Sequence, residues 1–413
     1  MNILYVAFPC NPYAGSESKI GWNIPVASAQ MGNNVLIVTI KDMQNDIEDY
    51  LKKNYLERVD IEYIDIPQVL KKILKKFSTI KLKLYHMMAI KKIRRIIKDG
   101  KKIDIIHQIT PVEFRSIGNY YKIRNVKVIV GPVGGGEYIP KTLKYYGKNK
   151  ICIEVIRRTL NLFEKIKLKI NRKKLKYTKL LFANKETMEY LKMEKRIVMP
   201  EVGVLKQEIN NRKKIILNDN IVFIVSGRLV YRKGHELLLN VLKNIQDDVE
   251  YKVIIIGDGR EAKNIKEEIN NDNKLKKHVE ILGKIKYEDM KKEYDKADVL
   301  IMPSLRETTG SVILEAMANG LAVIAMNSFG AKLIINNSNG YLYDGTSKEE
   351  IESSLKQCII SCITNKIELL EKKKKAIEDV EKYTFENKMK KYNNIYRDLL
   401  ICDMEEKNDR NMY

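Results

Sequence analysis

The sequence lacks the features by which membrane-spanning and secreted proteins are recognised. No uninterrupted apolar run reaches about 18 residues, the length that a membrane-spanning helix needs. The opening residues, MNILYVAFPC, contain no basic stretch of the kind that begins a secretory signal. We therefore expect a cytoplasmic protein without a membrane span.

A disulfide framework and internal repeats are missing as well. The five cysteines are an odd number and lie scattered, and the one close pair, Cys358 and Cys362, has the spacing of a single helical face. We interpret the cysteines as reduced thiols in a core and not as metal ligands. At 413 residues the chain is long enough for two or three domains, each with a sizeable core.

Acidic residues are scarce in the first half of the chain. Residues 1–200 hold 40 Lys or Arg and 18 Asp or Glu, a net charge of +22, whereas residues 201–413 hold 36 and 35, a net charge of +1. A genome rich in AT would enrich both halves of the chain in lysine to the same extent. The asymmetry therefore indicates a surface role for the first half.

Two stretches of the first half, residues 70–98 and 151–179, combine a helical period with many lysines and arginines. Their apolar positions are Leu70, Ile73, Leu74, Phe77, Leu84, Met87, Met88, Ile93 and Ile97 in the first, and Ile156, Leu160, Phe163, Ile166 and Ile170 in the second. Each is either a helix packed on a core with a solvated basic face or a surface for anionic lipid, and we favour the lipid surface. A nucleic-acid binder would also be basic, but no recognised motif accompanies the charge.

Short apolar runs that suit buried parallel strands alternate with helical patterns along the chain. In the first half they are Ile3–Phe8, Val35–Ile40, Ile103–Ile106, Val126–Val130, Leu180–Ala183 and Ile197–Met199. In the second half they are Ile221–Ser226, Tyr251–Ile256, Val279–Leu282 and Val299–Met302. The pattern predicts an α/β fold of two parallel-sheet domains, residues 1–200 and 201–382, joined by a polar linker near residues 200–220.

The most informative stretch is LIMPSLRETTGSVILEAMANGLAVI, residues 300–324. It predicts a strand, a loop with Glu307 and a helix that begins near Ser311 and ends at Gly320. Amides at such a helix start favour a phosphate. Glu307 and Glu315 would repel a phosphate, but each can accept hydrogen bonds from a hydroxyl pair, so together they suggest a nucleotide sugar. The alternative is two solvated glutamates on the surface.

Two other loops of the second half carry candidate ligand groups. Arg228 and Lys233, in GRLVYRKG, precede a helix and could neutralise a diphosphate or simply be solvated. GDGREA, with Gly257, Gly259 and Ala262, fits the G-x-G-x-x-A fingerprint of dinucleotide-binding proteins. Because another strand and helix precede it, we interpret GDGREA as a turn that contacts a nucleotide.

The first half has three candidate segments. Gly15 lies in a loop after the first strand, where open α/β sheets bind ligands, although an ordinary turn fits equally well. His107 follows the apolar run Ile103–Ile106 and is either a site residue at the strand's end or a structural hydrogen-bonding residue. A glycine-rich loop follows the next strand and would suit a mobile acceptor loop. This candidate acceptor region consists of Gly134, Gly135, Gly136 and Glu137.

Taken together, these segments resemble retaining glycosyltransferases of the GT-B fold, in glycosyltransferase family 4 (glycosyl transferases group 1). GRLVYRKG, IIGDGRE and the Glu307 and Glu315 pair, separated by seven residues, follow one another in the family's order. GSESKIGW, HQITP and GPVGGGE resemble N-terminal segments of some members. The resemblance covers most of the chain. It implies two Rossmann-like domains facing each other across a cleft, with a helix in residues 383–413 that crosses back to the first domain.

The resemblance also implies roles for single residues. Glu307 would contact the transferred sugar, Glu315 would hold the ribose, and Arg228 with Lys233 would bind the diphosphate. The catalytic residues would be Glu307, Arg228, Lys233 and His107, and the donor-binding residues Glu315, Ser311, Val312, Gly310, Gly15, Gly257 and Gly259. The chain departs from the family at Thr308 and Thr309, where Gly and Phe are frequent, and at Ala322, where Pro is frequent. These departures leave the identity of the sugar open.

The expected chemistry needs no metal ion, because no Asp-x-Asp pair occurs in the chain. The donor would be a UDP- or GDP-sugar and the acceptor a glycan or lipid-linked glycan. Family habit and the basic first half suggest polysaccharide, capsule or lipopolysaccharide assembly, with the protein peripheral on the inner face of the cytoplasmic membrane. A nucleotide-sugar epimerase of similar architecture and an NAD-dependent oxidoreductase are the rival enzymes.

Overall fold

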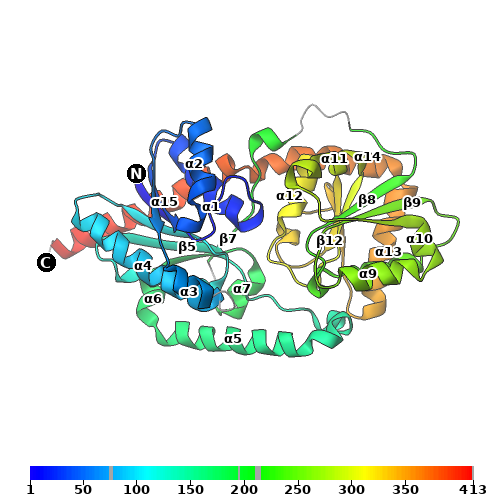
Figure 1. Ribbon diagram of the computed structural model, residues 1–413, viewed down its shortest axis with the longest axis horizontal. Helices are drawn as coiled ribbons and strands as arrows, with labels where there is room; N and C mark the ends of the chain where they lie inside the picture. Colours follow the sequence, from blue (N-terminus) through cyan, green and yellow to red (C-terminus); the bar gives the residue numbers. More distant parts are fainter. Residues whose placement is uncertain (74–77, 194–195, 210–214, 412–413) are drawn as a thin grey trace. The chain divides into compact units, whose positions relative to one another are not determined.

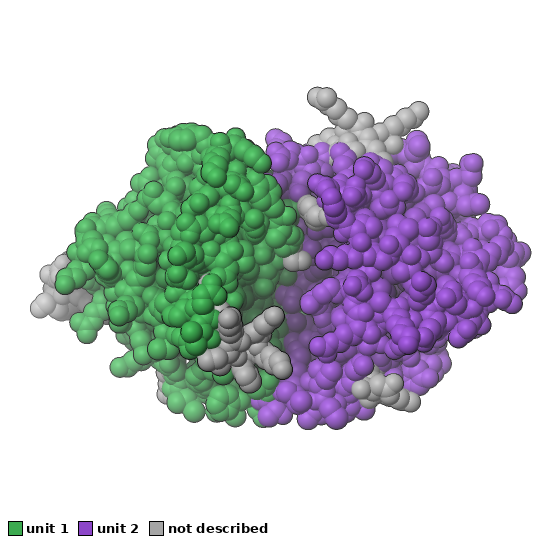
Figure 2. Space-filling model, viewed as in Figure 1, with its two compact units in different colours: residues 1–136, 160–203, 384–413 green, residues 137–159, 204–383 purple. Residues whose placement is uncertain are grey.

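The structure is a computed structural model that describes residues 1–73, 78–193, 196–209 and 215–411. The chain forms two compact units (Figure 2). The first unit comprises Met1–Gly136, Leu160–Gly203 and Thr384–Tyr413, and the second comprises Glu137–Thr159 and Val204–Tyr383. Each unit contains one parallel sheet with its own hydrophobic core. Within the described residues, no helix is both long enough and apolar enough to cross a membrane.

The sheet of the first unit has seven strands in the order β3-β2-β1-β4-β5-β6-β7 (Figure 1). The strands are β1 (Asn2–Ala7), β2 (Asn34–Ile40), β3 (Val59–Ile64), β4 (Ile105–Thr110), β5 (Lys127–Val133), β6 (Lys179–Phe182) and β7 (Ile197–Val198). The helices are α1 (Ser16–Gln30), α2 (Gln44–Lys53), α3 (Gln68–Ile73), α4 (Ser78–Lys98), α6 (Arg172–Lys176), α7 (Lys185–Tyr190) and α15 (Phe385–Asn411). Helix α5 (Ile151–Ile170) begins in the second unit and continues in the first.

The sheet of the second unit has six strands in the order β10-β9-β8-β11-β12-β13. The strands are β8 (Ile221–Ser226), β9 (Tyr251–Ile256), β10 (Val279–Gly283), β11 (Val299–Met302), β12 (Ala322–Met326) and β13 (Gly340–Tyr343). The helices are α8 (His235–Lys243), α9 (Ala262–Asn270), α10 (Asn273–His278), α11 (Met290–Lys296), α12 (Ser311–Ala318), α13 (Lys348–Thr364) and α14 (Lys366–Asp379). The strands β11 and β12 are buried throughout, as continuous apolar runs predict.

Both sheets confirm the predicted fold class, because every strand pair is parallel and both sheets are doubly wound. In each sheet the strand order reverses once, between β1 and β4 and between β8 and β11. Ligands of open α/β sheets bind at such reversals, beyond the carboxyl ends of the two strands. The loops that follow β8 and β11 therefore lie where the second unit is expected to bind a ligand.

The two faces of β1 carry different helices because its side chains alternate. Leu4 and Val6 belong to the core that contains Tyr85 and Ile93 of α4. Tyr5 points the other way, and its hydroxyl lies 3.1 Å from that of Tyr396 on α15. The final helix thus completes the hydrophobic interior of the first unit.

The first basic stretch packs on this core, contrary to the predicted lipid surface. Tyr85, Ala89 and Ile93 of α4 are fully buried, so the lysines and arginines of this helix form the solvated face of an ordinary amphipathic helix. The side chains of Leu74 and Phe77 lie outside the described residues. The second basic stretch, residues 151–179, instead exposes the apolar side chains named for it above.

Candidate functional site

Two loops meet at the strand reversal of the second unit: the β8 loop, residues 227–234, and the site loop, residues 303–310. The Leu305 amide donates to the Arg232 carbonyl at 2.9 Å. Gly234 has a φ of +71°, and a Cβ there would lie 1.9 Å from the Pro303 carbonyl oxygen. Only glycine permits this close approach, so the sequence YRKG fixes the two loops against each other.

A partly buried ion pair links the two loops. Lys233 Nζ donates to Glu307 Oε2, and the Arg232 guanidinium lies 3.5 Å from the same oxygen. The side chains of Lys233 and Glu307 are each 14% exposed. Burial raises the pKa of Glu307, but the charges of Lys233 and Arg232 outweigh it and bring the pKa below the ordinary 4.5. Glu307 is therefore an ionised carboxylate at neutral pH.

Of the three cations in this region, Lys233 and Arg232 are paired with Glu307 and Arg228 is not. Lys233, predicted to bind a diphosphate, forms an ion pair with Glu307. The Arg228 side chain is exposed and makes no ion pair or hydrogen bond within the described part of the chain. Arg232 was missed by sequence reasoning, although it adjoins Lys233 in the same motif.

The site loop ends at Gly310, which has a φ of +92° and precedes α12. A Cβ at Gly310 would lie 3.5 Å from the Glu307 Cγ, so the first turn of α12 begins beside this glutamate. The amides of Ser311 and Val312 find no acceptor among the described residues, as expected for the first turn of a helix without a side-chain cap. These amides and the helix dipole provide a place for an anion.

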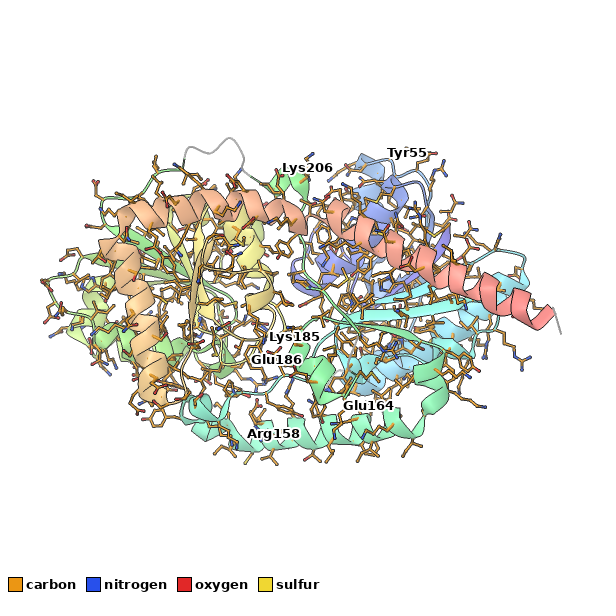
Figure 3. All side chains as sticks on the ribbon, turned by 180° about the vertical axis from the view of Figure 1, so that it is seen from behind. Tyr55, Arg158, Glu164, Lys185, Glu186 and Lys206 are labelled. Atoms are coloured by element: carbon orange, nitrogen blue, oxygen red, sulfur yellow. The ribbon has the colours of Figure 1, made fainter. Side chains whose placement is uncertain are left out.

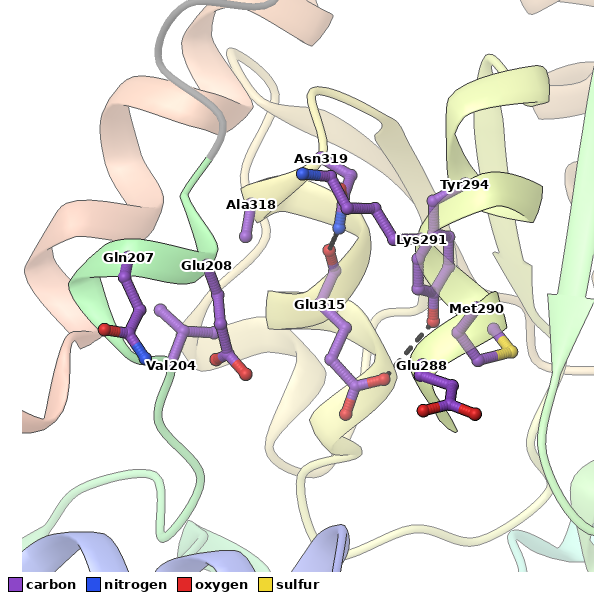
Figure 4. Close-up of a pocket in the computed structure, with 10 residues that line it drawn as sticks. All are labelled: Val204, Gln207, Glu208, Glu288, Met290, Lys291, Tyr294, Glu315, Ala318 and Asn319. Carbon is purple, nitrogen blue, oxygen red and sulfur yellow. Dashed lines mark hydrogen bonds between the residues drawn. The ribbon is translucent and has the colours of Figure 1, made fainter. Parts of the chain in front are cut away.

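Glu315, one turn further along α12, lines a pocket of about 250 Å³ (Figure 4). The Tyr294 hydroxyl donates to Glu315 Oε2 at 3.3 Å. The carboxylates of Glu208 and Glu288 line the same pocket. A pocket with three carboxylates and a tyrosine hydroxyl suits a ligand that presents hydroxyl groups. Tyr294 was not identified from the sequence.

The glycines of GDGREA have a structural reason in the second unit. A Cβ at Gly257 would lie 1.8 Å from the Gly227 carbonyl oxygen, and one at Gly259 would lie 2.3 Å from the Leu229 carbonyl oxygen. They let the loop after β9 pack against the β8 loop. Because β9 is not at the strand reversal, the dinucleotide fingerprint lacks the position that it has in dinucleotide-binding domains.

His107 does not end its strand, because β4 continues to Thr110. The imidazole is fully buried, with Nδ1 2.6 Å from the Tyr396 hydroxyl and Nε2 2.7 Å from the Gly131 carbonyl oxygen. Burial lowers its pKa to about 4. With both nitrogens engaged inside the first unit, His107 has the geometry of a structural residue, and we omit it from the proposed catalytic group.

Gly15 precedes α1 at the strand reversal of the first unit, where a ligand-binding loop was predicted. Its neighbour Glu17 accepts a hydrogen bond from the Val112 amide at 2.6 Å and so joins the loops after β1 and β4. Burial raises the pKa of Glu17. The segment around Gly15 is therefore held in place by a contact within the first unit.

The glycine-rich segment is pinned, in contrast to the mobile loop that we predicted. The Gly135 carbonyl accepts from Asn161 Nδ2 at 2.9 Å, and the Gly136 amide donates to Thr187 Oγ1 at 3.1 Å. Gly134 pairs with Glu113 as an isolated bridge. Glu137 belongs to the second unit, where it accepts a hydrogen bond from the Thr308 hydroxyl at 3.2 Å.

The architecture matches that of known structures. Sucrose-phosphate synthase from Thermosynechococcus elongatus superposes with a TM-score of 0.67 over 97% of this chain and 99% of that chain, at 18% identity. At this identity the likeness establishes the fold alone. Two doubly wound parallel-sheet units of this kind make up the GT-B fold, which confirms the predicted architecture.

A family model matches part of the second unit. Residues 206–382 match the model of the family described as Glycosyl transferases group 1. The matched residues include the Lys233 and Glu307 ion pair and α12, as the motifs predicted.

The curated relatives match mainly through part of their length. An uncharacterized glycosyltransferase of Methanocaldococcus jannaschii is 29% identical over 194 residues, which is 46% of this chain and 49% of that protein. A GDP-mannose-dependent alpha-(1-6)-phosphatidylinositol monomannoside mannosyltransferase of Mycobacterium tuberculosis is 29% identical over 157 residues, 36% of this chain and 41% of that protein. The chain thus spans about half or less of the length of these relatives.

Proposed function

We propose that the protein transfers a sugar from a nucleoside diphosphate sugar to a glycan or lipid-linked glycan acceptor, with retention of configuration. The observation that carries this proposal is the partly buried ion pair between Lys233 and Glu307 at the strand reversal of the second unit. It joins a cation suited to a diphosphate and a carboxylate suited to sugar hydroxyls within one family-matched domain. The mannosyltransferase relative, named for GDP-mannose and a phosphatidylinositol mannoside, supports a nucleotide-sugar donor and a lipid-linked acceptor.

In this proposal the donor lies along α12. Its ribose hydroxyls bond Glu315 in the pocket, and its diphosphate meets the amides of Ser311 and Val312 with Arg228 and Lys233. Glu307 then faces the transferred sugar. Lys233 exchanges part of its contact with Glu307 for a phosphate oxygen, so the ion pair keeps both groups in place until the donor arrives. Gly257 and Gly259 bring the neighbouring loop close enough to contact the nucleotide.

The proposed reaction breaks the bond between the anomeric carbon and the diphosphate and forms a bond from that carbon to the acceptor oxygen. The acceptor hydroxyl attacks on the face from which the diphosphate leaves, and its proton passes to a phosphate oxygen. Arg228, Lys233 and the start of α12 stabilise the charge of the leaving diphosphate. The described residues contain no cluster of three His, Cys, Asp or Glu suited to a metal ion. Activity in the presence of a chelator tests whether a metal is needed.

A thermal-shift screen against UDP-sugars, GDP-sugars and NAD tests the donor. A ligand near a hundred times its Kd adds about 2.7 kcal/mol of stability, so the correct donor raises the Tm by several degrees. Glu315→Gln loses this shift for the bare nucleoside diphosphate as well, whereas Glu307→Gln loses only the part that the sugar adds. Glu349→Gln, exposed on α13, is the matched control. A shift with NAD alone refutes the proposal in favour of an oxidoreductase.

Kinetics test the roles in transfer. Arg228→Ala lowers kcat by about 10² to 10³, as for other preorganised charge-stabilising groups, while Lys276→Ala on α10 leaves kcat unchanged. NMR of the first-formed product gives the anomeric configuration, and an inverted product would remove the retaining mechanism. Turnover of the donor's sugar without any acceptor would instead favour an epimerase.

We also propose that the protein works on the inner face of the cytoplasmic membrane, in the assembly of a cell-surface polysaccharide or lipopolysaccharide. The net charge of +22 in residues 1–200 supports an anionic partner surface. Cell fractionation tests this placement: protein that stays with the membrane at low salt and leaves it at high salt is peripheral. Protein found only in the soluble fraction at low salt argues against it.

A further inference from the structure

Helix α5 turns its apolar side chains to the outside. Leu160, Phe163 and Ile170 are 51%, 64% and 78% exposed, and their spacing of three and seven residues sets them along one side of the helix. Leu162 and Ile166 widen this row and are also exposed. Nine of the 21 large hydrophobic side chains found exposed in the described part of the chain lie on this one helix.

The inner side of α5 is largely polar. Asn161 is fully buried and donates to the Gly135 carbonyl, and Glu164 is 8% exposed and bonds Lys167. Figure 3 labels Glu164 on this helix. Leu168 is the one large apolar side chain that the helix buries in the described structure. An amphipathic helix on the surface of a soluble protein buries its apolar side and exposes its polar side. The reversed arrangement of α5 indicates a surface that binds a partner.

Cations accompany the apolar row. The exposed basic residues of α5 and α6 within the first unit are Lys167, Lys169, Lys173 and Lys176. The two glutamates of α5 are withdrawn from this surface, because Glu164 is buried and Glu154 bonds Arg306. The surface therefore joins apolar side chains to positive charge, with no exposed carboxylate from the helix itself.

We propose that α5 docks the protein on an anionic lipid surface, with Leu160, Phe163, Ile166 and Ile170 among the acyl chains and the lysines at the lipid phosphates. Interfacial helices bury an apolar face about 5–10 Å deep, and their basic residues meet anionic headgroups. The proposal deepens the membrane placement given above by assigning it to α5 and not to α4, whose apolar residues fill the core. It does not depend on the identity of the sugar.

Flotation with lipid vesicles tests the α5 surface in the full chain. The protein floats with vesicles of phosphatidylcholine and phosphatidylglycerol, does not float with phosphatidylcholine alone, and is released by salt. The double variants Leu160→Asp/Phe163→Asp and Lys167→Glu/Lys169→Glu each weaken partitioning at least about tenfold. Matched controls are Tyr55→Asp, an 89% exposed aromatic residue labelled in Figure 3, and Lys98→Glu/Lys102→Glu around the end of α4.

Three outcomes overturn the docking proposal: equal flotation with neutral vesicles, no flotation with either, or loss of binding in the controls alone. A second copy of the chain could also cover the row, so sedimentation is run on the same variants. A dimer of the wild type that Leu160→Asp/Phe163→Asp converts to monomer overturns the lipid assignment. Donor turnover with a soluble acceptor is measured in parallel, and its absence in the wild type would refute the proposed function without touching this proposal.

A different set of contacts concerns the two residues beside Glu307. Arg306 donates to Glu154 Oε1 at 3.0 Å, and the Thr308 hydroxyl donates to Glu137 Oε1 at 3.2 Å. Both carboxylates come from the segment Glu137–Thr159, which belongs to the second unit although it lies far earlier in the chain. Each neighbour of Glu307 is thus held by a carboxylate from outside the site loop.

Further contacts orient these two carboxylates. Arg157 lies 3.6 Å from Glu137 Oε1 and donates to the Glu137 carbonyl at 2.7 Å. The Tyr231 hydroxyl, from the β8 loop, donates to Glu154 Oε1. Glu137 is only 4% exposed and Glu154 only 12%, so solvent does not compete strongly for these bonds.

We infer that Glu137 and Glu154 are positioning residues that fix the site loop, and through it the carboxylate of Glu307. The inference rests on the proposed function, because it assigns Glu307 to the transferred sugar. It also gives a use to Thr308, one of the positions at which the chain departs from its family. A displacement of about 1 Å at a reacting group can cost about 10²-fold in rate, so loss of this support lowers kcat.

Thr308→Val removes the hydroxyl at nearly constant shape and lowers kcat at least about tenfold, with the Kd of the nucleoside diphosphate unchanged. Thr308→Ser restores the hydroxyl and most of the activity. Thr364→Val, at the exposed end of α13, is the matched control. An unchanged kcat in Thr308→Val, or equal losses in the valine and serine variants, would overturn the inference. An inactive wild type would instead mark failure of the proposed function.

Discussion

Glu307 shows how one carboxylate can be both buried and charged. Removing a carboxylate from water favours its protonated form, and a nearby cation opposes this. In this protein two cations act on a single oxygen, and their effect on the pKa exceeds that of burial. The charge on Glu307 is therefore stabilised by Lys233 and Arg232.

Lys233→Met tests this dependence. Burial then acts on Glu307 with Arg232 and the Thr308 amide to oppose it but without Lys233, so the pKa of Glu307 rises. In the wild type the folded pKa is depressed, so the ion pair stabilises the protein above pH 4.5 and is lost as the pH falls through the lower value. In the variant the acid limb of kcat/KM against pH moves to higher pH, whereas Lys276→Met leaves it in place. An unmoved limb in Lys233→Met would show that another group sets it.

At the scale of elements, the Tyr396 hydroxyl joins α15 to two strands of the first unit. The Tyr396 hydroxyl lies 2.6 Å from His107 Nδ1 and 3.1 Å from the Tyr5 hydroxyl. The Tyr392 ring, one turn earlier, packs against the same imidazole, but its buried hydroxyl has no hydrogen-bond partner in the described structure. A comparison of Tyr392 with Tyr396 therefore distinguishes the contribution of ring packing to stability from that of hydrogen bonding.

Tyr396→Phe leaves the buried Nδ1 of His107 without a partner and removes one contact of the Tyr5 hydroxyl, so it lowers the free energy of unfolding of the first unit by about 1–3 kcal/mol. Tyr392→Phe removes a hydroxyl that already lacks a partner, and stability is unchanged or rises. Urea unfolding followed by the fluorescence of Trp22, the single tryptophan, measures both. Equal losses in the two variants would mean that the Tyr396 hydroxyl contributes nothing specific.

The loops of the second unit depend on glycine for their packing. Gly257 has a φ of +145°, and its Cβ would overlap the Gly227 carbonyl oxygen. Gly257→Ala therefore lowers the free energy of unfolding of the second unit by more than about 2 kcal/mol through strain and overlap. Gly283→Ala, at φ +71° with no atom near its Cβ, costs only about 1 kcal/mol. Circular dichroism in urea compares them, and the reverse order of stability would refute the close-approach argument.

The sequence predicted strands well where chemistry is local. Ile221–Ser226, Tyr251–Ile256 and Val299–Met302 are largely apolar segments between turn residues, and the observed strands have the same bounds. The strand β4 was cut short at His107 because its later residues are polar. Gln108 is nevertheless buried there, since its amide bonds backbone groups of Ser116 and Gly118. The hydrogen bonds that satisfy this buried amide come from residues outside the strand, so the sequence pattern of the strand does not predict them.

Helical periodicity has a related limit. It reveals an apolar row on a helix but does not say whether the protein or the solvent lies on that side. The two basic stretches gave the same signal, yet α4 buries Tyr85 and Ile93 whereas α5 exposes Leu160 and Phe163. In the site, the Glu307 and Lys233 pair joins residues 74 apart in sequence. Strand order explains their meeting, but no spacing rule predicts the bond.

At the scale of the whole molecule, the two units differ in how they respond to acid. Burial lowers the pKa of His86 to about 3 and that of His107 to about 4, and both belong to the first unit. In the second unit burial lowers the pKa of His235 to about 4. Each histidine takes up a proton below pH 6.5 only after unfolding, so stability falls as the pH falls through this range.

The expected slope is about 1.4 kcal/mol per pH unit for each histidine below its unfolded pKa, and hence about twice as large for the first unit as for the second. Burial raises the pKa values of Glu17 and Glu236, which act in the opposite sense, but one lies in each unit and the difference between the units remains. Urea midpoints between pH 7 and pH 5, read from Trp22 fluorescence, report the first unit.

His86→Gln removes one of the two protonation steps and so flattens the pH dependence of the Trp22 transition by about half. His235→Gln, in the other unit, leaves the Trp22 transition unaltered and is the matched control. Parallel pH slopes in wild type and His86→Gln would mean that His86 is not held neutral by burial. If His235→Gln changed the Trp22 slope as well as His86→Gln, the two units would unfold as one, and acid would act on the molecule as a whole.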